Sequence, residues 1–212
     1  MKKLLLSACF GALLLAGCSG KVEKPKEEPV EKEAVQEQET EEVVTFENID
    51  AGSKATVEKL VKKYNTMVEF MKQDEEEPIE IASMSEPLTN ELTVEDNGFS
   101  QTLLDADVLG YDGHYVINSK YDAEKRITGY SLKAEGLNML SEEGDDLVEV
   151  FTAIAALIEV LGLNIDLYEA ESDKALDEDF GTHTYTDGDY TISMNFEDFL
   201  AGEISVDYNL TK

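Results

Sequence analysis

The spacing of apolar residues changes from a helical to a strand-like period after Pro78, and this change constrains the fold more than any other feature. Before Pro78, apolar residues recur at i, i+3, i+4 and i+7, which is the pattern of one face of an amphipathic helix. These residues are Val57, Leu60, Val61, Tyr64, Met67, Val68 and Met71. Gly52-Ser53 offers the N-cap, and Gln73, which precedes an acidic run, closes the expected helix.

Short runs of alternating apolar and polar residues follow, and this alternation is the pattern of half-buried β-strands. The first five expected strands span residues 79–84, 92–95, 99–104, 115–121 and 127–134. Asp96-Asn97-Gly98 and Asp112-Gly113 are typical of tight turns. We therefore expect consecutive strands to form antiparallel hairpins.

A second helical region has a different character. Residues 147–161 are apolar around most of the helix circumference, but they are too few to cross a membrane, which takes about 20 residues. We expect a buried helix, with Ser141 and Asp145-Asp146 near its start and Gly162 at its end. A short helix at 165–176 and strands at 182–186, 190–196 and 203–210 complete the chain. The predicted class is α+β, with helices packed on one face of an antiparallel sheet.

Two parts of the chain resemble each other. The segment Asp112-Gly113-His114-Tyr115-Val116-Ile117 lies 75 residues before Asp187-Gly188-Asp189-Tyr190-Thr191-Ile192, and apolar residues continue at matching alternate positions after both. One interpretation is an internal repeat, over about 46–135 and 141–212, whose two units share a sheet or abut. The other is that two unrelated hairpins with Asp-Gly turns look alike. The sequence leaves both open.

The chain is strongly acidic. It has 212 residues, of which 47 are acidic and 17 basic, and its formal net charge is −30. A polyanion gains no affinity by neutralising phosphates, so we expect no nucleic-acid partner. Anionic membranes repel such a chain unless something else anchors it. The hydrophobic fraction of 42% is nevertheless enough to build a folded core.

The N-terminus has the layout of an export signal. A short basic start, Met1-Lys2-Lys3, precedes an apolar run over residues 4–16, and small residues follow it. The run ends in Leu15-Ala16-Gly17-Cys18, which resembles the lipobox of bacterial lipoproteins. In that family the cysteine is diacylated and becomes the first residue after cleavage. The resemblance implies cleavage between Gly17 and Cys18, lipid attachment at Cys18 and a location on the extracytoplasmic face of the cell membrane.

A polar segment separates the lipobox from the first helix. Residues 19–45 include nine acidic and four basic side chains without a stable apolar period, so the segment is typical of a solvated tether. Its composition is similar to that of tethers in Gram-positive lipoproteins. We divide the chain into a signal peptide (1–17), a lipidated cysteine with a disordered acidic tether (18–45) and an α+β domain (46–212). The domain itself has a net charge of −27.

The sequence contains few of the motifs that are typical of catalytic sites. We therefore predict that the chain is not an enzyme and binds no cofactor. Cys9 would leave with the signal peptide, so the mature chain retains Cys18 alone and forms no internal disulfide. The sequence has no Gly-x-Ser-x-Gly motif and no glycine-rich phosphate loop after a strand. His114 and His183 are candidates for an acid–base pair or for metal ligation, but exposed positions beside turns explain them better.

Several clusters of carboxylates make calcium a further candidate ligand, because Ca²⁺ prefers oxygen ligands. The candidate ligands are Asp105, Asp107 and Asp112, then Asp177, Glu178 and Asp179, then Asp187 and Asp189. None of these groups fits an EF-hand loop, and tight turns explain the two Asp-Gly pairs. We therefore predict diffuse, weak cation binding by the acidic surface and no specific metal site.

Two functions remain open from the sequence. The first is a non-enzymatic surface domain that binds a protein or another envelope ligand, for example on a Tyr-rich sheet face with Asn118, Ser193 and Asn195 on the opposite face. The second is a carrier or sensor that encloses a small hydrophobic ligand between the sheet and the helix at 147–161. We favour the first, because an ordinary filled core accounts for the same apolar residues.

Overall fold

The computed structural model describes residues 43–73, 81–85, 91–108, 112–138, 145–177 and 181–211. The segment Glu41–Lys212 forms one compact unit. Within the described residues it contains three α-helices and a seven-stranded antiparallel sheet, which confirms the predicted α+β class. The predicted signal peptide and lipid site, with Gly17 and Cys18, lie outside the described residues. No helix in the described part of the chain is long and apolar enough to cross a membrane.

Helix α1 (Ala51–Lys72) follows the periodicity of the sequence. Its buried residues include Val57, Leu60 and Tyr64, which are all on the expected face. The N-cap is Asp50 and not the expected Gly52-Ser53, because the Asp50 carboxylate accepts a hydrogen bond of 3.0 Å from the backbone N–H of Ser53. This hydrogen bond lowers the pKa of Asp50 below its usual value.

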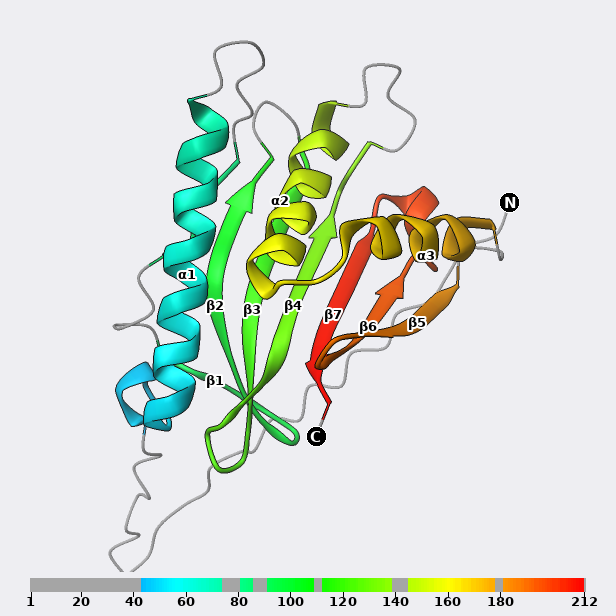
Figure 1. Ribbon diagram of the computed structural model, residues 1–212. Helices are drawn as coiled ribbons and strands as arrows, with labels where there is room; N and C mark the ends of the chain where they lie inside the picture. The colour runs from blue at the N-terminus through cyan, green and yellow to red at the C-terminus, as the bar shows by residue number, and fades with distance from the viewer. Residues whose placement is uncertain are drawn as a thin grey trace, which may run out of the picture. The chain divides into compact units, whose positions relative to one another are not determined.

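Helices α2 (Asp145–Leu161) and α3 (Ile165–Asp177) follow each other closely. Gly162 ends α2 as expected, with a φ of 76° in the left-handed region that favours glycine. The expectation that α2 is buried around most of its circumference is wrong on one side, where Val148 and Phe151 are 52% and 37% exposed. The inner side of α2 packs on the sheet, and no other described element lies over its outer side in Figure 1.

The strands lie in the order β1-β2-β3-β4-β7-β6-β5, and each neighbouring pair is antiparallel. They are β1 (Thr93–Glu95), β2 (Gly98–Asp107), β3 (His114–Asp122), β4 (Ile127–Glu135), β5 (Thr182–Asp187), β6 (Tyr190–Asn195) and β7 (Ile204–Leu210). Each of these seven strands was expected from the alternation of the sequence, with ends that differ by a few residues.

The strand expected at 79–84 is absent from its described part, residues 81–84. Side chains, and not a neighbouring strand, satisfy two of its backbone groups. The Tyr115 hydroxyl accepts a hydrogen bond from the Ala82 N–H at 3.1 Å, and the Asn65 side chain accepts one from the Met84 N–H at 2.8 Å. The alternation in this segment therefore reflects docking onto α1 and β3.

The two Asp-Gly pairs have different structures. Gly188 and Asp189 form a two-residue turn between β5 and β6, and Gly188 has a φ of 55°. In contrast, residues 108–113 separate β2 from β3, so Asp112-Gly113 is not the tight turn that we expected. The match between these two motifs is thus weaker in structure than in sequence.

The strand order is symmetric about the boundary between β4 and β7. Strands β3 and β2 lie on one side, and β6 and β5 lie on the other. Ser131 of β4 pairs directly with Asp207 of β7 at this boundary. Two three-stranded units that share a sheet would have this order, so the topology accommodates the internal repeat, which stays a prediction.

All three helices lie over the same face of the sheet (Figure 1), and the core lies between the helices and this face. Tyrosines contribute much of it, and Tyr64, Tyr115, Tyr130 and Tyr208 are among the largest fully buried side chains. The Tyr-rich sheet face is therefore covered and is not a surface for partners. We call the opposite face of the sheet the open face.

Candidate functional site

The two histidines do not form a pair. His114 begins β3 and His183 is on β5, and strands β4, β7 and β6 lie between these strands in the sheet. Neighbouring strands are about 4.8 Å apart, so roughly 19 Å separates the two strands. A shared acid–base or metal site that includes both histidines is therefore wrong.

His114 lies beside two of the carboxylates that the sequence singled out. Its Nε2 is 3.3 Å from Asp105 Oδ1, and its Nδ1 is 3.0 Å from Asp107 Oδ1. Both aspartates are exposed, at 66% and 89%, so water competes for these contacts. Within the described residues, no group of three or more His, Cys, Asp and Glu side chains is arranged to hold a metal ion.

His183 forms a second small cluster with Glu171 and Lys174 of α3. Its Nε2 is 2.6 Å from Glu171 Oε2, and Lys174 Nζ is 2.5 Å from Glu171 Oε1. Hydrogen bonds from Lys174 and His183 hold the pKa of Glu171 below its usual value. The cluster joins α3 to the edge strand β5, which is a structural role.

The remaining calcium candidates have separate places. Asp187 Oδ2 accepts a hydrogen bond of 2.6 Å from the backbone N–H of the residue before α3, and the carbonyl of Asp189 accepts one from the residue after β7. Asp112 lies in the loop before β3 and Asp177 ends α3. Residues 178 and 179 lie outside the described part of the chain.

Most side chains of the open face are polar, and they lie in rows that run across the strands. Pairing between strands fixes a central row that crosses six strands, from Thr102 through Asn118, Ser131, Asp207 and Ser193 to Thr184. One flanking row runs through Ser100, Lys120, Gly129, Asn209, Thr191 and Thr186, and the other through Asp105, Val116, Lys133, Ser205, Asn195 and Thr182. These rows contain two aspartates and two lysines, so this part of a highly acidic protein has no net charge.

The sequence identified three members of the open face but not their arrangement. Asn118 and Ser193 share the central row, and Asn195 lies in a flanking row. Alternation along each strand gives the face on which a residue lies. The rows depend in addition on the pairing of β4 with β7, which joins residues that are distant in the sequence.

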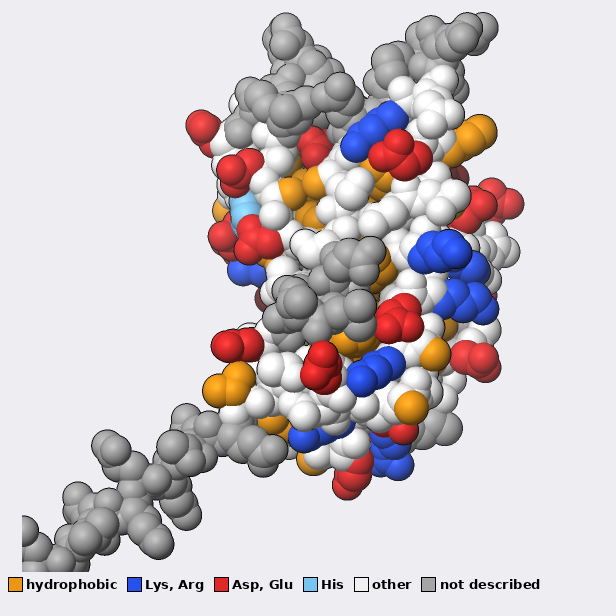
Figure 2. Space-filling model, turned by 90° about the vertical axis from the view of Figure 1, so that its left-hand side faces the viewer, with side chains coloured by type: hydrophobic (Ala, Val, Ile, Leu, Met, Phe, Trp, Pro, Cys, Tyr) orange, Lys and Arg blue, Asp and Glu red, His pale blue; other side chains and the backbone are white. Residues whose placement is uncertain are grey.

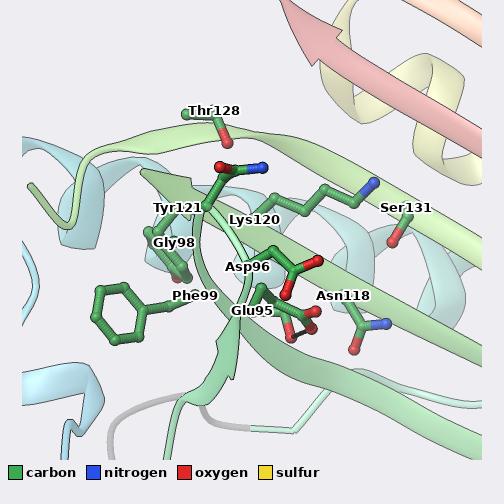
Figure 3. A pocket seen from close by; sticks show the side chains of 11 residues that line it. Glu95, Asp96, Gly98, Phe99, Asn118, Lys120, Tyr121, Thr128 and Ser131 are labelled. Atoms are coloured by element: carbon green, nitrogen blue, oxygen red, sulfur yellow. Dashed lines mark hydrogen bonds between the residues drawn. The ribbon is translucent and has the colours of Figure 1, made fainter. Parts of the chain in front are cut away.

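A hollow of about 430 Å³ lies on the open face beside the β1–β2 hairpin (Figure 3). Glu95 and Asp96 come from the hairpin, whereas Asn118, Lys120 and Ser131 come from β3 and β4. In Figure 3 the two carboxylates lie close to the Asn118 side chain. These groups offer both donors and acceptors, so the hollow suits a polar group that presents hydrogen-bond donors to the carboxylates.

Lys120 reaches across β4 to form an ion pair with Asp207 of β7. The strand that it crosses has Gly129, without a side chain, and Ser131, with a short one, at the neighbouring positions. A Cβ atom on Gly129 would lie 2.1 Å from the Tyr208 carbonyl oxygen, so this position has no room for a side chain. The ion pair neutralises the centre of the open face.

The space between α2 and the sheet is filled by the chain's own side chains. Ile154 and Leu157 of α2 are at most 1% exposed, as are Ile117 and Leu132 of the sheet. The hollow beside the β1–β2 hairpin is open to solvent. Two grooves, one between α1 and α2 and the other between α2 and α3, are also open to solvent. The described core therefore resembles an ordinary packed interior more than a ligand cavity.

A buried carboxylate lies in this core, and it was not among the predicted site residues. Glu149 of α2 is 8% exposed, and its Oε1 accepts a hydrogen bond of 2.9 Å from the Tyr115 hydroxyl. Burial, with a contribution from Glu149, raises the pKa of Tyr115 well above its usual value. The sequence indicates such a contact only by one acidic residue, Glu149, at a position where the other residues of the helix face are apolar. The contact joins α2 to β3.

No protein-family model, curated protein or solved structure matches the chain.

Proposed function

We propose that the chain is a lipoprotein anchored on the extracytoplasmic face of the cell membrane, and that its domain binds a protein or another envelope ligand without catalysis. The Leu15-Ala16-Gly17-Cys18 motif and the polar segment after it support the anchor. One lipid chain gives only marginal membrane binding, so diacylation of the cysteine suits a permanent attachment. The ligand-binding surface in this proposal is the open face.

The observation that carries the proposal is the central polar row across six strands. Its hydroxyl, amide and carboxylate groups are short, so they lose little side-chain entropy when a ligand orders them. They both donate and accept hydrogen bonds. Because Lys120 neutralises Asp207, the row does not repel an acidic partner as the acidic parts of the protein surface do. The expected ligand is thus a polar surface with little charge of its own.

Other functions have less support. A carrier that encloses a hydrophobic ligand between the sheet and α2 needs an internal cavity, whereas the described side chains there pack against each other. A hydrolase needs a nucleophile beside a base, whereas His114 and His183 each contact exposed or surface carboxylates. A binding domain therefore fits the described residues better than either alternative.

Site-specific photocrosslinking in intact cells tests the proposal. A photoreactive amino acid is placed at Asn118 or Ser193 on the open face and, as a control, at the exposed Ala170 on α3. We expect the same discrete adduct from both open-face positions and no such adduct from position 170. Absence of an adduct at both open-face positions, or an identical adduct from the control, would contradict the proposal.

A further inference from the structure

We propose that the outer face of α1 docks on an anionic lipid bilayer and so orients the domain at the membrane. This inference rests on the lipid anchor of the proposed function. It concerns Lys59, Lys62, Lys63, Thr66 and Phe70, which we call the lysine face. At the level of the whole chain, an anionic membrane repels this protein. The lysine face is a local exception.

The spacing of these residues places them on one side of the helix. Positions 59, 62, 63, 66 and 70 are related by i, i+3, i+4, i+7 and i+11, which is a single helical face. The buried residues of α1, such as Val57, Leu60 and Tyr64, lie on the opposite face. The lysine face also borders a groove of about 530 Å³, whose other side is Glu159 and Val160 of α2.

The charge of this face differs from that of the rest of the domain. Helix α1 carries five of the 11 basic residues of positions 46–212, against two acidic residues, Glu58 and Glu69. Figure 2 shows Lys and Arg side chains gathered along the right-hand side of the view, over α1. Lys63 Nζ donates a hydrogen bond of 3.3 Å to the Val160 carbonyl, whereas Lys59 and Lys62 form no ion pair with a described residue. Because no described carboxylate is paired with Lys59 or Lys62, both ammonium groups are available to anionic headgroups.

Phe70 adds an apolar group to the same face. Its side chain is 76% exposed, the largest exposure among the large hydrophobic residues of the described chain. An aromatic ring beside lysines is the composition of surfaces that lie in the interface of a bilayer, where the ring enters the headgroup region and the lysines contact phosphates. An acidic peptide would use the lysines, but it would not require an exposed ring at the edge of the face.

Anchoring makes a weak docking surface effective. The predicted tether runs from Cys18 to the residues just before α1, so a lipid on Cys18 would keep α1 close to the bilayer at a high effective concentration. Glu58 and Glu69 of α1 remain close to the bilayer, whereas salt screens the repulsion of any carboxylate that lies further away than one Debye length of about 8 Å. Because the helices and the open face lie on opposite sides of the sheet, docking through α1 keeps the open face accessible.

The test uses the fluorescence of a single introduced tryptophan. The chain has no Trp, so Phe70→Trp in residues 19–212 gives one reporter on the lysine face, without the signal peptide or the lipid. We expect a blue shift of emission on addition of vesicles of phosphatidylcholine with phosphatidylglycerol, and none with phosphatidylcholine alone. The shift should disappear at high salt concentration.

Paired charge reversals identify the surface. Lys59→Glu with Lys62→Glu, made in the chain that carries Phe70→Trp, should raise the lipid concentration at half-shift by about ten-fold or more. Lys125→Glu with Lys133→Glu makes the same change of net charge away from the lysine face, and it should leave the midpoint within about two-fold. Circular dichroism verifies that both variants are folded.

Any one of the following outcomes would overturn the inference. They are the absence of a shift with anionic vesicles, an equal shift with neutral vesicles, and equal effects of the two double variants. A shift with polyglutamate but not with vesicles would also overturn it, in favour of an acidic protein partner. Because the tested chain lacks the lipid and the crosslinking experiment concerns the open face, failure here is distinguishable from failure of the proposed function.

Discussion

Tyr115 on β3 donates a hydrogen bond of 2.9 Å to the carboxylate of Glu149 on α2, and both side chains are buried. The same hydroxyl accepts a hydrogen bond from the backbone N–H of Ala82, in the segment that docks beside α1. One hydroxyl group thus connects the sheet, a helix and an irregular segment. A buried polar contact of this kind is costly to break, because the partners that remain lose a hydrogen bond in a place that water does not reach.

Tyr115→Phe should therefore lower the free energy of unfolding by about 1–3 kcal/mol. The matched control is Tyr130→Phe, which removes a hydroxyl that is equally buried but has no hydrogen-bond partner among the described residues. Tyr130→Phe should leave the free energy of unfolding unchanged or raise it slightly, since no hydrogen bond is lost. Urea unfolding of the two variants measures both values. Equal destabilisation would show that the hydrogen bonds of Tyr115 contribute nothing specific.

Buried tyrosines make the fold sensitive to alkali. Among the tyrosines whose pKa burial raises, the six least exposed have values above the unfolded value of about 10, and two of these six have a pKa of about 12. The six are Tyr64, Tyr115, Tyr121, Tyr130, Tyr168 and Tyr208. Above pH 10 the folded state binds more protons than the unfolded state, so this stability is present below pH 10 and is lost as the pH rises. Each such tyrosine lowers the free energy of unfolding by about 1.4 kcal/mol for each pH unit between its unfolded and its folded pKa.

We therefore expect a cooperative transition between about pH 10 and about pH 12, in which tyrosinate absorbance and loss of circular dichroism change together. Six groups acting together suffice to overcome a typical stability of about 5–15 kcal/mol. A gradual titration of absorbance without loss of secondary structure would contradict the burial of these hydroxyl groups.

Gly202, before β7, marks a close approach between the two halves of the sheet. It has a φ of 85°, and a Cβ atom there would lie 2.2 Å from the carbonyl oxygen of Leu137, which follows β4. Gly188 also has a positive φ, but it faces open space. Gly188→Ala should cost about 1 kcal/mol from backbone strain alone, whereas Gly202→Ala should cost about 3 kcal/mol or more. Thermal unfolding compares the two variants, and equal melting temperatures would contradict the close approach of Gly202 to Leu137.

The lipid anchor has its own test. Cys18→Ala should remove the protein from the membrane fraction, because it removes the expected site of acylation. Since an uncleaved signal peptide would itself hold the chain at the membrane, metabolic labelling with an alkyne analogue of palmitate accompanies the fractionation. The original chain should incorporate the label and the variant should not. Retention of the label in the variant would exclude Cys18 as the acylated residue.

Local patterns in the sequence were sufficient to predict most helices and strands. The period of 3.6 residues in α1 and the alternation in β3 are properties of neighbouring residues, and the structure has both elements where they were expected. Residues 81–84 show the limit of this reasoning, because their alternation suits a strand, but Tyr115 and Asn65 satisfy backbone groups of the segment. The Asp50 N-cap was missed because the adjacent Gly52-Ser53 offers a similar signal.

The arrangement of the open face depends on contacts between distant residues. The pairing of Ser131 with Asp207, and the reach of Lys120 across Gly129, follow from the order of strands, which no local pattern specifies. The lysine face, in contrast, had a local signal in its helical spacing. It was missed because the net charge of −30 was averaged over the whole chain.

The most direct measurement of the central claim is the affinity of the partner that the open face captures. It compares the original chain with Ser131→Arg, at the centre of the polar row, and with Ala170→Arg, which makes the same change on the exposed side of α3. A large cation at position 131 displaces the short side chains from contact, so we predict binding at least about ten-fold weaker for Ser131→Arg and unchanged for Ala170→Arg. Equal affinities for the three chains would contradict binding through the open face.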